Sequence, residues 1–125
     1  MQSGYLAIET HRDRPGFLRL VLSSESPDTA SAPHSERRLR YVARFNDCEA
    51  ALMHVHEILK RRLINPDAHL YRASLEQTIA AIESLDLRHR RVYLDPGISA
   101  ERNATIEALT KQICVRHRSR AAFFQ

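Results

Sequence analysis

Arginine is the residue type in this chain that has the most obvious chemistry, since only Lys60 and Lys111 among its 19 Lys and Arg residues are lysine. A guanidinium group binds phosphate through two parallel hydrogen bonds and stacks on flat rings. The arginines predicted to bind nucleic acid are Arg38, Arg40, Arg44, Arg61, Arg62, Arg88, Arg90 and Arg91. A solvated basic surface without a partner is an alternative of similar weight, because a net charge of +4 does not by itself indicate a nucleic-acid-binding protein.

The histidines and cysteines do not follow the spacing of a metal site or a disulfide framework. His54 and His56 are two residues apart, which places them on different faces of a helix. Cys48 and Cys114 are far apart and belong to no C-x-x-C motif. The chain also lacks a glycine-rich phosphate loop and a G-x-S-x-G nucleophile motif. We therefore expect reduced thiols, no bound metal and no cofactor.

Hydrophobic periodicity predicts a mixed α+β domain. The predicted strands are residues 5–10, 17–22 and 39–45, and the predicted helices are residues 47–63, residues 74–85 and a segment from Ser99 onward. Residues 69–72 are expected to be extended, and residues 86–95 to be a loop or a short strand. This order predicts a small three-stranded antiparallel sheet flanked by helices, with an extra C-terminal helix.

The length of 125 residues and a hydrophobic content of 43% indicate one compact domain. Within it we expect an α+β core at residues 1–85 and a C-terminal extension, a loop plus a helix, at residues 86–125. No apolar run approaches the ~18 residues of a membrane span, and the N-terminal residues do not resemble a signal peptide. These features predict a cytoplasmic protein with no membrane association. Phe123 and Phe124 are expected to dock onto this chain, a protein partner or a second copy in a homodimer.

Several short segments, in the same order along the chain, resemble the GIY-YIG nuclease superfamily in its phage and bacterial branch. The resemblance spans about residues 4–85. Its segments are Gly4 to Ile8, Pro15 to Ser24, Ser26-Pro27, the stretch Leu52 to Leu59 with His56-Glu57, Arg62 to Tyr71, and Ser74 to Ile82. The resemblance implies a small antiparallel sheet flanked by helices and, in active members, metal-dependent cleavage of nucleic acid.

The chain departs from the family pattern at the positions that carry the chemistry. The family's catalytic arginine corresponds to Ala30, and its metal-binding glutamate corresponds to Leu52. Val21 replaces a second-strand glycine, and His69 replaces a further glutamate. Such a nuclease needs a carboxylate for its cation and a positive group for the developing phosphate charge. These departures predict a degenerate domain that acts as a binding module, either for DNA or RNA through the arginine-rich face or for a protein through the C-terminal helix.

Two alternatives remain open at the level of sequence. The first is a divergent endonuclease that uses Mg²⁺ or Mn²⁺ with displaced catalytic groups, namely Tyr5, Arg37 or Arg38, Glu49 and His56. The second is a protein-interaction or assembly module on an unrelated α+β fold, with no ligand and no role in nucleic-acid binding.

Overall fold

The computed structural model describes residues 2–27 and 36–123, with side chains up to residue 114. The elements run in the order β1 (Gly4–His11), β2 (Phe17–Ser23), β3 (Arg37–Phe45), α1 (Cys48–Leu59), the 3₁₀-helix η1 (Lys60–Arg62), β4 (Leu63–Asn65), β5 (Leu70–Arg72), α2 (Leu75–Glu83), β6 (His89–Leu94) and α3 (Ala100–Phe123). The α+β class is confirmed.

The sheet is larger than the sequence predicted. Its strands lie in the order β4-β5-β2-β1-β3-β6, and every neighbouring pair is antiparallel. The expected three strands form its centre, but the described residues build six strands, so the predicted sheet size was wrong. The added strands are short or highly basic: β5 and β6 pair with the outer edges of β2 and β3, and β4 pairs with β5. One of them, β6, belongs to the 86–125 extension, which thus shares its sheet with the 1–85 core.

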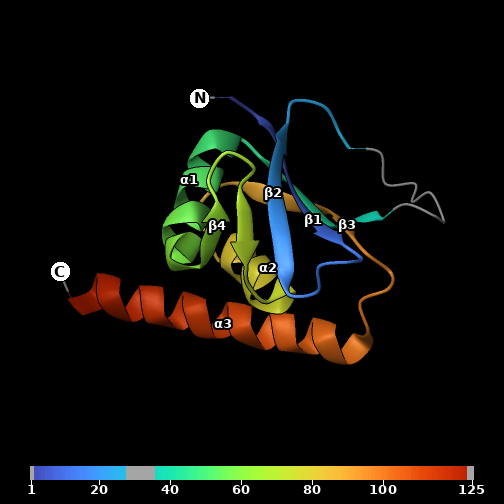
Figure 1. Cartoon of the computed structure of the whole chain (residues 1–125). Coiled ribbons are helices and arrows are strands. Elements are labelled where there is room, and N and C mark those ends of the chain that lie inside the picture. The colour runs from blue at the N-terminus through green and yellow to red at the C-terminus, as the bar shows by residue number, and fades with distance from the viewer. Residues whose placement is uncertain (1, 28–35, 124–125) are drawn as a thin grey trace.

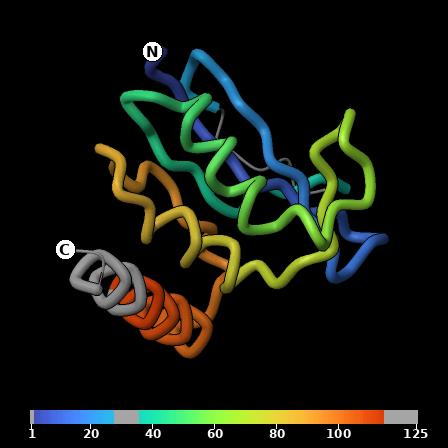
Figure 2. The backbone as a smooth tube through the Cα atoms, turned by 90° about the vertical axis from the view of Figure 1, so that its left-hand side faces the viewer, coloured from blue at the N-terminus to red at the C-terminus, as the bar shows by residue number. Residues whose placement is uncertain are grey.

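Helices α1 and α2 cover one face of the sheet, and α3 lies beyond α2 in a further layer (Figures 1 and 2). We call the helix-covered face the inner face and the opposite one the outer face. Side chains alternate along a strand. In β1, Leu6 and Ile8 belong to the buried core with the helices, so Tyr5, Ala7 and Glu9 face outward.

The inner face packs against helices whose first turns are capped by side chains. Asp47 accepts a hydrogen bond from the Ala50 N–H at the start of α1, and Ser74 accepts one from the Gln77 N–H at the start of α2. The buried side chains of these helices that belong to the hydrophobic core shared with the sheet are Cys48, Ala51, Val55, Leu59, Leu75, Ile79 and Ile82. Each fully buried large aliphatic side chain contributes about 1.5–3 kcal/mol to folding.

Gly4 shows why β1 must begin with a small residue. A Cβ atom there would lie 2.9 Å from the Cys48 Sγ and 2.9 Å from the Ser23 carbonyl oxygen. The Cys48 N–H also donates to the Gln2 carbonyl at 3.0 Å. The start of α1 is therefore held directly against the start of β1.

Helix α3 begins where the sequence predicted, with the Ser99 Oγ accepting from the Arg102 N–H. It spans 24 residues and packs against α2, with Ile106 only 1% exposed. The predicted interface residues Phe123 and Phe124 lie outside the residues whose side chains are described.

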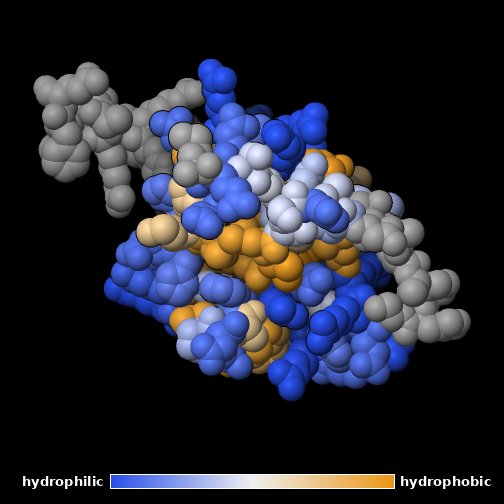
Figure 3. Space-filling model, turned by 90° about the horizontal axis from the view of Figure 1, so that it is seen from above, coloured by the Kyte–Doolittle hydropathy of each residue, from blue (hydrophilic) through white to orange (hydrophobic). Residues whose placement is uncertain are grey.

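The surface is mostly hydrophilic. Seen from above the view of Figure 1, polar residues surround a hydrophobic area near the middle (Figure 3). The large hydrophobic side chains exposed on the described part of the chain are Met53, Ile58, Ile64 and Val92. Within residues 2–27 and 36–123, no helix combines the length and the apolar character that crossing a membrane requires.

Candidate nucleic-acid interface

The outer face brings together residues that the sequence analysis considered separately. In the strand register, Tyr5 lies opposite Arg44, and Arg44 lies opposite Arg90. These three side chains form one row across β1, β3 and β6. None of the three helices covers this face (Figures 1 and 2). Tyr5 and Arg44 are half-buried, and Arg90 is exposed.

The next row of the outer face is apolar and ends in a second tyrosine. Ala7 lies opposite Val21 and Val42, and Val42 lies opposite Tyr93. Ala7 and Val42 are buried, whereas Tyr93 is half-buried. The face thus has a floor of small apolar side chains that is bordered by two tyrosines and two arginines.

Three of the eight predicted nucleic-acid-binding arginines are paired with acids instead. The Arg38 Nε lies 2.7 Å from Asp95 Oδ2, and the Arg40 Nε lies 3.1 Å from the same oxygen. Asp95 is 3% exposed, and its Oδ1 also accepts from the Gly97 N–H at 2.9 Å. Gly97 leaves room for this arrangement, because a Cβ there would overlap the Arg38 guanidinium.

An irregularity in β3 explains why Arg38 and Arg40 reach Asp95. Ile8 pairs with Tyr41 but Glu9 pairs with Leu39, so β3 holds one extra residue, Arg40. Such a bulge reverses the alternation on one side of it. Arg38 is thereby turned toward the inner side, where Asp95 follows the end of β6. Burial lowers the pKa of Arg40 even though Asp95 favours its charged form.

Arg91 is the third paired arginine, and it also faces the inner side. It lies opposite Ala43, a core residue, and its guanidinium forms an ion pair with Glu83 at the end of α2. The Arg91 Nε donates to Glu83 Oε1 at 3.1 Å. Burial, the largest single influence, lowers the pKa of Arg91, but the hydrogen bonds and negative charges of Glu83 and Tyr41 together outweigh it and raise that pKa. This pair connects β6 to α2.

The remaining five arginines form no ion pair with any residue of the described ranges, and they fall into two groups. Arg44, Arg88 and Arg90 lie at one end of the β3–β6 pair, where the Asn46 N–H donates to the Arg88 carbonyl at 3.2 Å. Arg61 and Arg62 are exposed in η1 after the last turn of α1. Because α1 has 12 residues and starts just after β3, the two groups are separated by about 18 Å along that helix.

The residues proposed for the nuclease alternative are not brought together. Tyr5 points from the outer face. The His56 Nδ1 lies 2.7 Å from the hydroxyl of Tyr71, a core residue on the inner side. Glu49 is exposed in the first turn of α1, about 10 Å along the helix from His56. Leu52 packs against the core.

The two arginines of that alternative also lie apart from His56. Arg37 is exposed at the start of β3, opposite His11 at the end of β1. Arg38 is paired with Asp95, as described above. Ala30, at the position of the family's catalytic arginine, lies outside the described residues.

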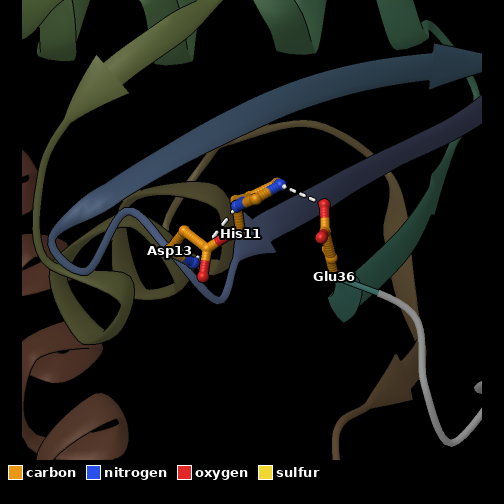
Figure 4. Close-up of side chains that lie close together, drawn as sticks. All are labelled: His11, Asp13 and Glu36. Atoms are coloured by element: carbon orange, nitrogen blue, oxygen red, sulfur yellow. Dashed lines mark hydrogen bonds and ion pairs between the residues drawn. The ribbon is translucent and has the colours of Figure 1, made fainter.

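One cluster of potential metal ligands was missed by the sequence analysis. His11, Asp13 and Glu36 place one ligand atom each within 4.8 Å of one another (Figure 4). The His11 Nδ1 accepts from the Asp13 N–H at 3.2 Å, so the Nε2 carries the ring proton toward Glu36 Oε2 at 3.4 Å. A cation bound through Nε2 would have to displace that proton. In the sequence only His11 and Asp13 are close to each other. Glu36 is brought to them by the pairing of β1 with β3.

His11 and Asp13 also line a cleft of about 530 Å³ at the end of the β1–β2 hairpin. Arg14, Arg19 and Arg37 line it as well, so cations and acids are mixed there. Arg19 lies 4.0 Å from Glu9, its neighbour across the strands. Compared with this cleft, the row of Tyr5, Arg44 and Arg90 carries positive charge without an opposing acid.

Comparisons of the chain with protein-family models, with curated proteins and with solved structures found no match.

Proposed function

We propose that this chain is a non-catalytic, GIY-YIG-like domain that binds nucleic acid through the end of its β3–β6 pair. The binding group comprises Arg44, Arg88 and Arg90, which we call the basic edge. The observation that carries the proposal is that Arg44 and Arg90 lie directly opposite each other with no acid beside them. Like charges in this position are unfavourable in the free protein. A phosphate backbone that neutralises both charges therefore binds more favourably here than it would at arginines already paired with acids.

The loss of catalysis is supported by the residues at the family's chemical positions. Leu52 packs against the core where a carboxylate would be needed. Tyr5 and His56 lie on opposite sides of the sheet, and His56 is already engaged with Tyr71. A substrate phosphate bound near Tyr5 would be out of reach of His56.

The test is fluorescence anisotropy of labelled DNA and RNA, titrated with salt in the presence of Mg²⁺. We expect the logarithm of the association constant to fall linearly with the logarithm of the salt concentration, because contacts to phosphates release counterions. The double variant Arg44→Ser/Arg90→Ser should bind about tenfold more weakly and with a salt slope shallower by about 1.5. The control Arg61→Ser/Arg62→Ser has the same net charge, and its slope and affinity should change little.

Two results would contradict the proposal. One is an absence of binding at low salt, and the other is an equal loss of affinity in both double variants, which would indicate only a diffuse charge effect. The same mixtures run on a gel test the non-catalytic part. Cleavage with Mg²⁺ or Mn²⁺ would favour the divergent endonuclease.

A further inference from the structure

We infer that the outer face of the sheet binds a single strand rather than a duplex, with Tyr5 and Tyr93 as stacking platforms for two of its bases. The inference rests on the proposed function and names the form of nucleic acid that this surface fits. A ring that stacks on bases needs an accessible face, a nearby cation for the phosphates and a ligand whose bases are not already stacked.

The four tyrosines of the chain divide into two pairs with different surroundings. Tyr41 and Tyr71 are 0% exposed and belong to the core of the inner face. Tyr5 and Tyr93 lie on the outer face and are half-buried. A buried aromatic pair is explained by packing, whereas the outer pair contributes little to the core.

The spacing of the outer pair fits one continuous strand. Tyr5 and Tyr93 are two strands and one row apart, which corresponds to about 12 Å between their Cα atoms. The floor between them is made of Ala7 and Val42, which are 2% and 0% exposed. Because these two side chains are already covered, the bases would stack on the tyrosine rings that border the floor and not on the floor itself.

Charge complements this arrangement. Arg44 lies next to Tyr5 in its row and next to Val42 along β3, and Arg90 continues the row beyond it. A backbone that joins bases at Tyr5 and Tyr93 must pass these guanidinium groups. In a duplex the faces of the bases are hidden inside the stack. The tyrosines could therefore not stack on them, and only the phosphates would be contacted.

The native chain supplies a spectroscopic probe because it has no tryptophan and only two of its tyrosines lie outside the core. Titration with the oligonucleotides (dT)12 and (rU)12 should quench tyrosine fluorescence, since stacking places a base against the emitting ring. A 12-base-pair duplex should quench much less. Comparison of (dT)12 with (rU)12 distinguishes DNA from RNA as the preferred strand.

The decisive measurement compares (dT)12 with a strand of the same length that carries abasic sites in place of bases. Base stacking should make wild-type protein bind (dT)12 at least about tenfold more tightly than the abasic strand. Tyr5→Leu/Tyr93→Leu should lose most of this difference and retain its affinity for duplex. Tyr5→Phe/Tyr93→Phe keeps the rings and should bind as the wild type does. Circular dichroism checks that each variant is folded.

The outcomes separate this inference from the proposed function. If the abasic strand and (dT)12 bind equally, and the affinity still depends on Arg44 and Arg90, the stacking inference is wrong and the basic edge stands. If the duplex binds more tightly than either single strand, the stacking inference is wrong as well. If no oligonucleotide binds at low salt, both proposals are overturned.

Discussion

The two ends of β3 carry the same residue type in opposite circumstances. Near its start, Arg38 and Arg40 converge on the buried carboxylate of Asp95. Near its end, Arg44 lies opposite another arginine, Arg90. One end neutralises its charge within the fold, and we call it the paired end. The basic edge at the other end leaves its charge available to a ligand.

The difference shows that a run of arginines does not predict a binding surface by itself. Whether an arginine is available to a ligand depends on which residue a distant strand or turn places next to its guanidinium. Strand β6 delivers an arginine to one end of β3, and the turn that follows β6 delivers an aspartate to the other. A single extra residue in β3 then turns Arg38 toward that aspartate.

The largest effect on stability is expected from removing the acid of the paired end. Asp95→Asn leaves two guanidinium groups without their counterion, and Arg40 is only 15% exposed. Removing one partner of a buried ion pair costs about 3–5 kcal/mol, and we expect about 3 kcal/mol here because half of the Arg38 side chain is in solvent. Urea denaturation measures the change.

Glu57→Gln is the matched control for Asp95→Asn. It also removes an acid from an ion pair, but both Glu57 and Lys60 are exposed. Surface pairs contribute little to stability. The urea midpoint of this variant should stay at the wild-type value. Equal midpoints for the two variants would mean that the paired end does not stabilise the fold.

The second prediction concerns a variant in which the basic edge gains an ion pair. Arg90→Glu places a carboxylate opposite Arg44, and an opposite-charge pair across two strands adds about 0.5 kcal/mol. The variant should therefore unfold at slightly higher urea concentration while it binds nucleic acid at least about tenfold more weakly than the wild type. Arg62→Glu makes the same change of charge at η1 and should weaken binding much less. Stronger binding by Arg90→Glu would refute the assignment of the basic edge.

The smallest effect concerns acid sensitivity beside the paired end, where Arg102 of α3 is bound to Glu76 of α2. Burial alone raises the pKa of Glu76, but hydrogen bonds from Arg102 and Ser74 hold it below its usual value of 4.5. A carboxyl group whose pKa is lowered by folding stabilises the protein above pH 4.5, and this contribution disappears as the pH falls through the lower folded value.

Glu76→Gln should consequently be less stable than the wild type at pH 6, by less than about 1 kcal/mol because the pair is partly exposed. Between pH 6 and pH 3 the variant should lose less stability than the wild type does. Thermal unfolding at a series of pH values measures both. Parallel curves for the two proteins would show that this pair contributes nothing that depends on pH.

The local elements of the fold were predictable because their signals lie within a few residues. Alternating hydrophobic side chains mark β1, β2 and β3, and Asp47 and Ser74 mark the starts of two helices with the side chains that cap them. Strand β6 was not resolved from a loop, since His89, Arg90 and Arg91 carry little hydrophobic pattern. This segment forms a strand because it pairs with the edge of β3, which lies more than 40 residues earlier in the sequence and outside any short stretch used to predict secondary structure.

The candidate site was predictable in composition and not in geometry. The arginines of the basic edge were named from the sequence, but so were Arg38, Arg40 and Arg91, whose acids come from elsewhere in the chain. The tyrosine pair was missed because Tyr5 and Tyr93 are linked only through the register of three strands. The His11, Asp13 and Glu36 cluster was missed for the same reason.

The place of β6 in the chain has a consequence for the order of folding. The hairpin of β1 and β2 closes a short turn, but β6 reaches β3 only after α1, β4, β5 and α2 have been passed. Closing so long a segment costs more chain entropy and makes such a contact slow to form. Arg44 and Arg90 therefore meet only when the last strand docks, and a partly folded chain that has lost β6 cannot present the basic edge.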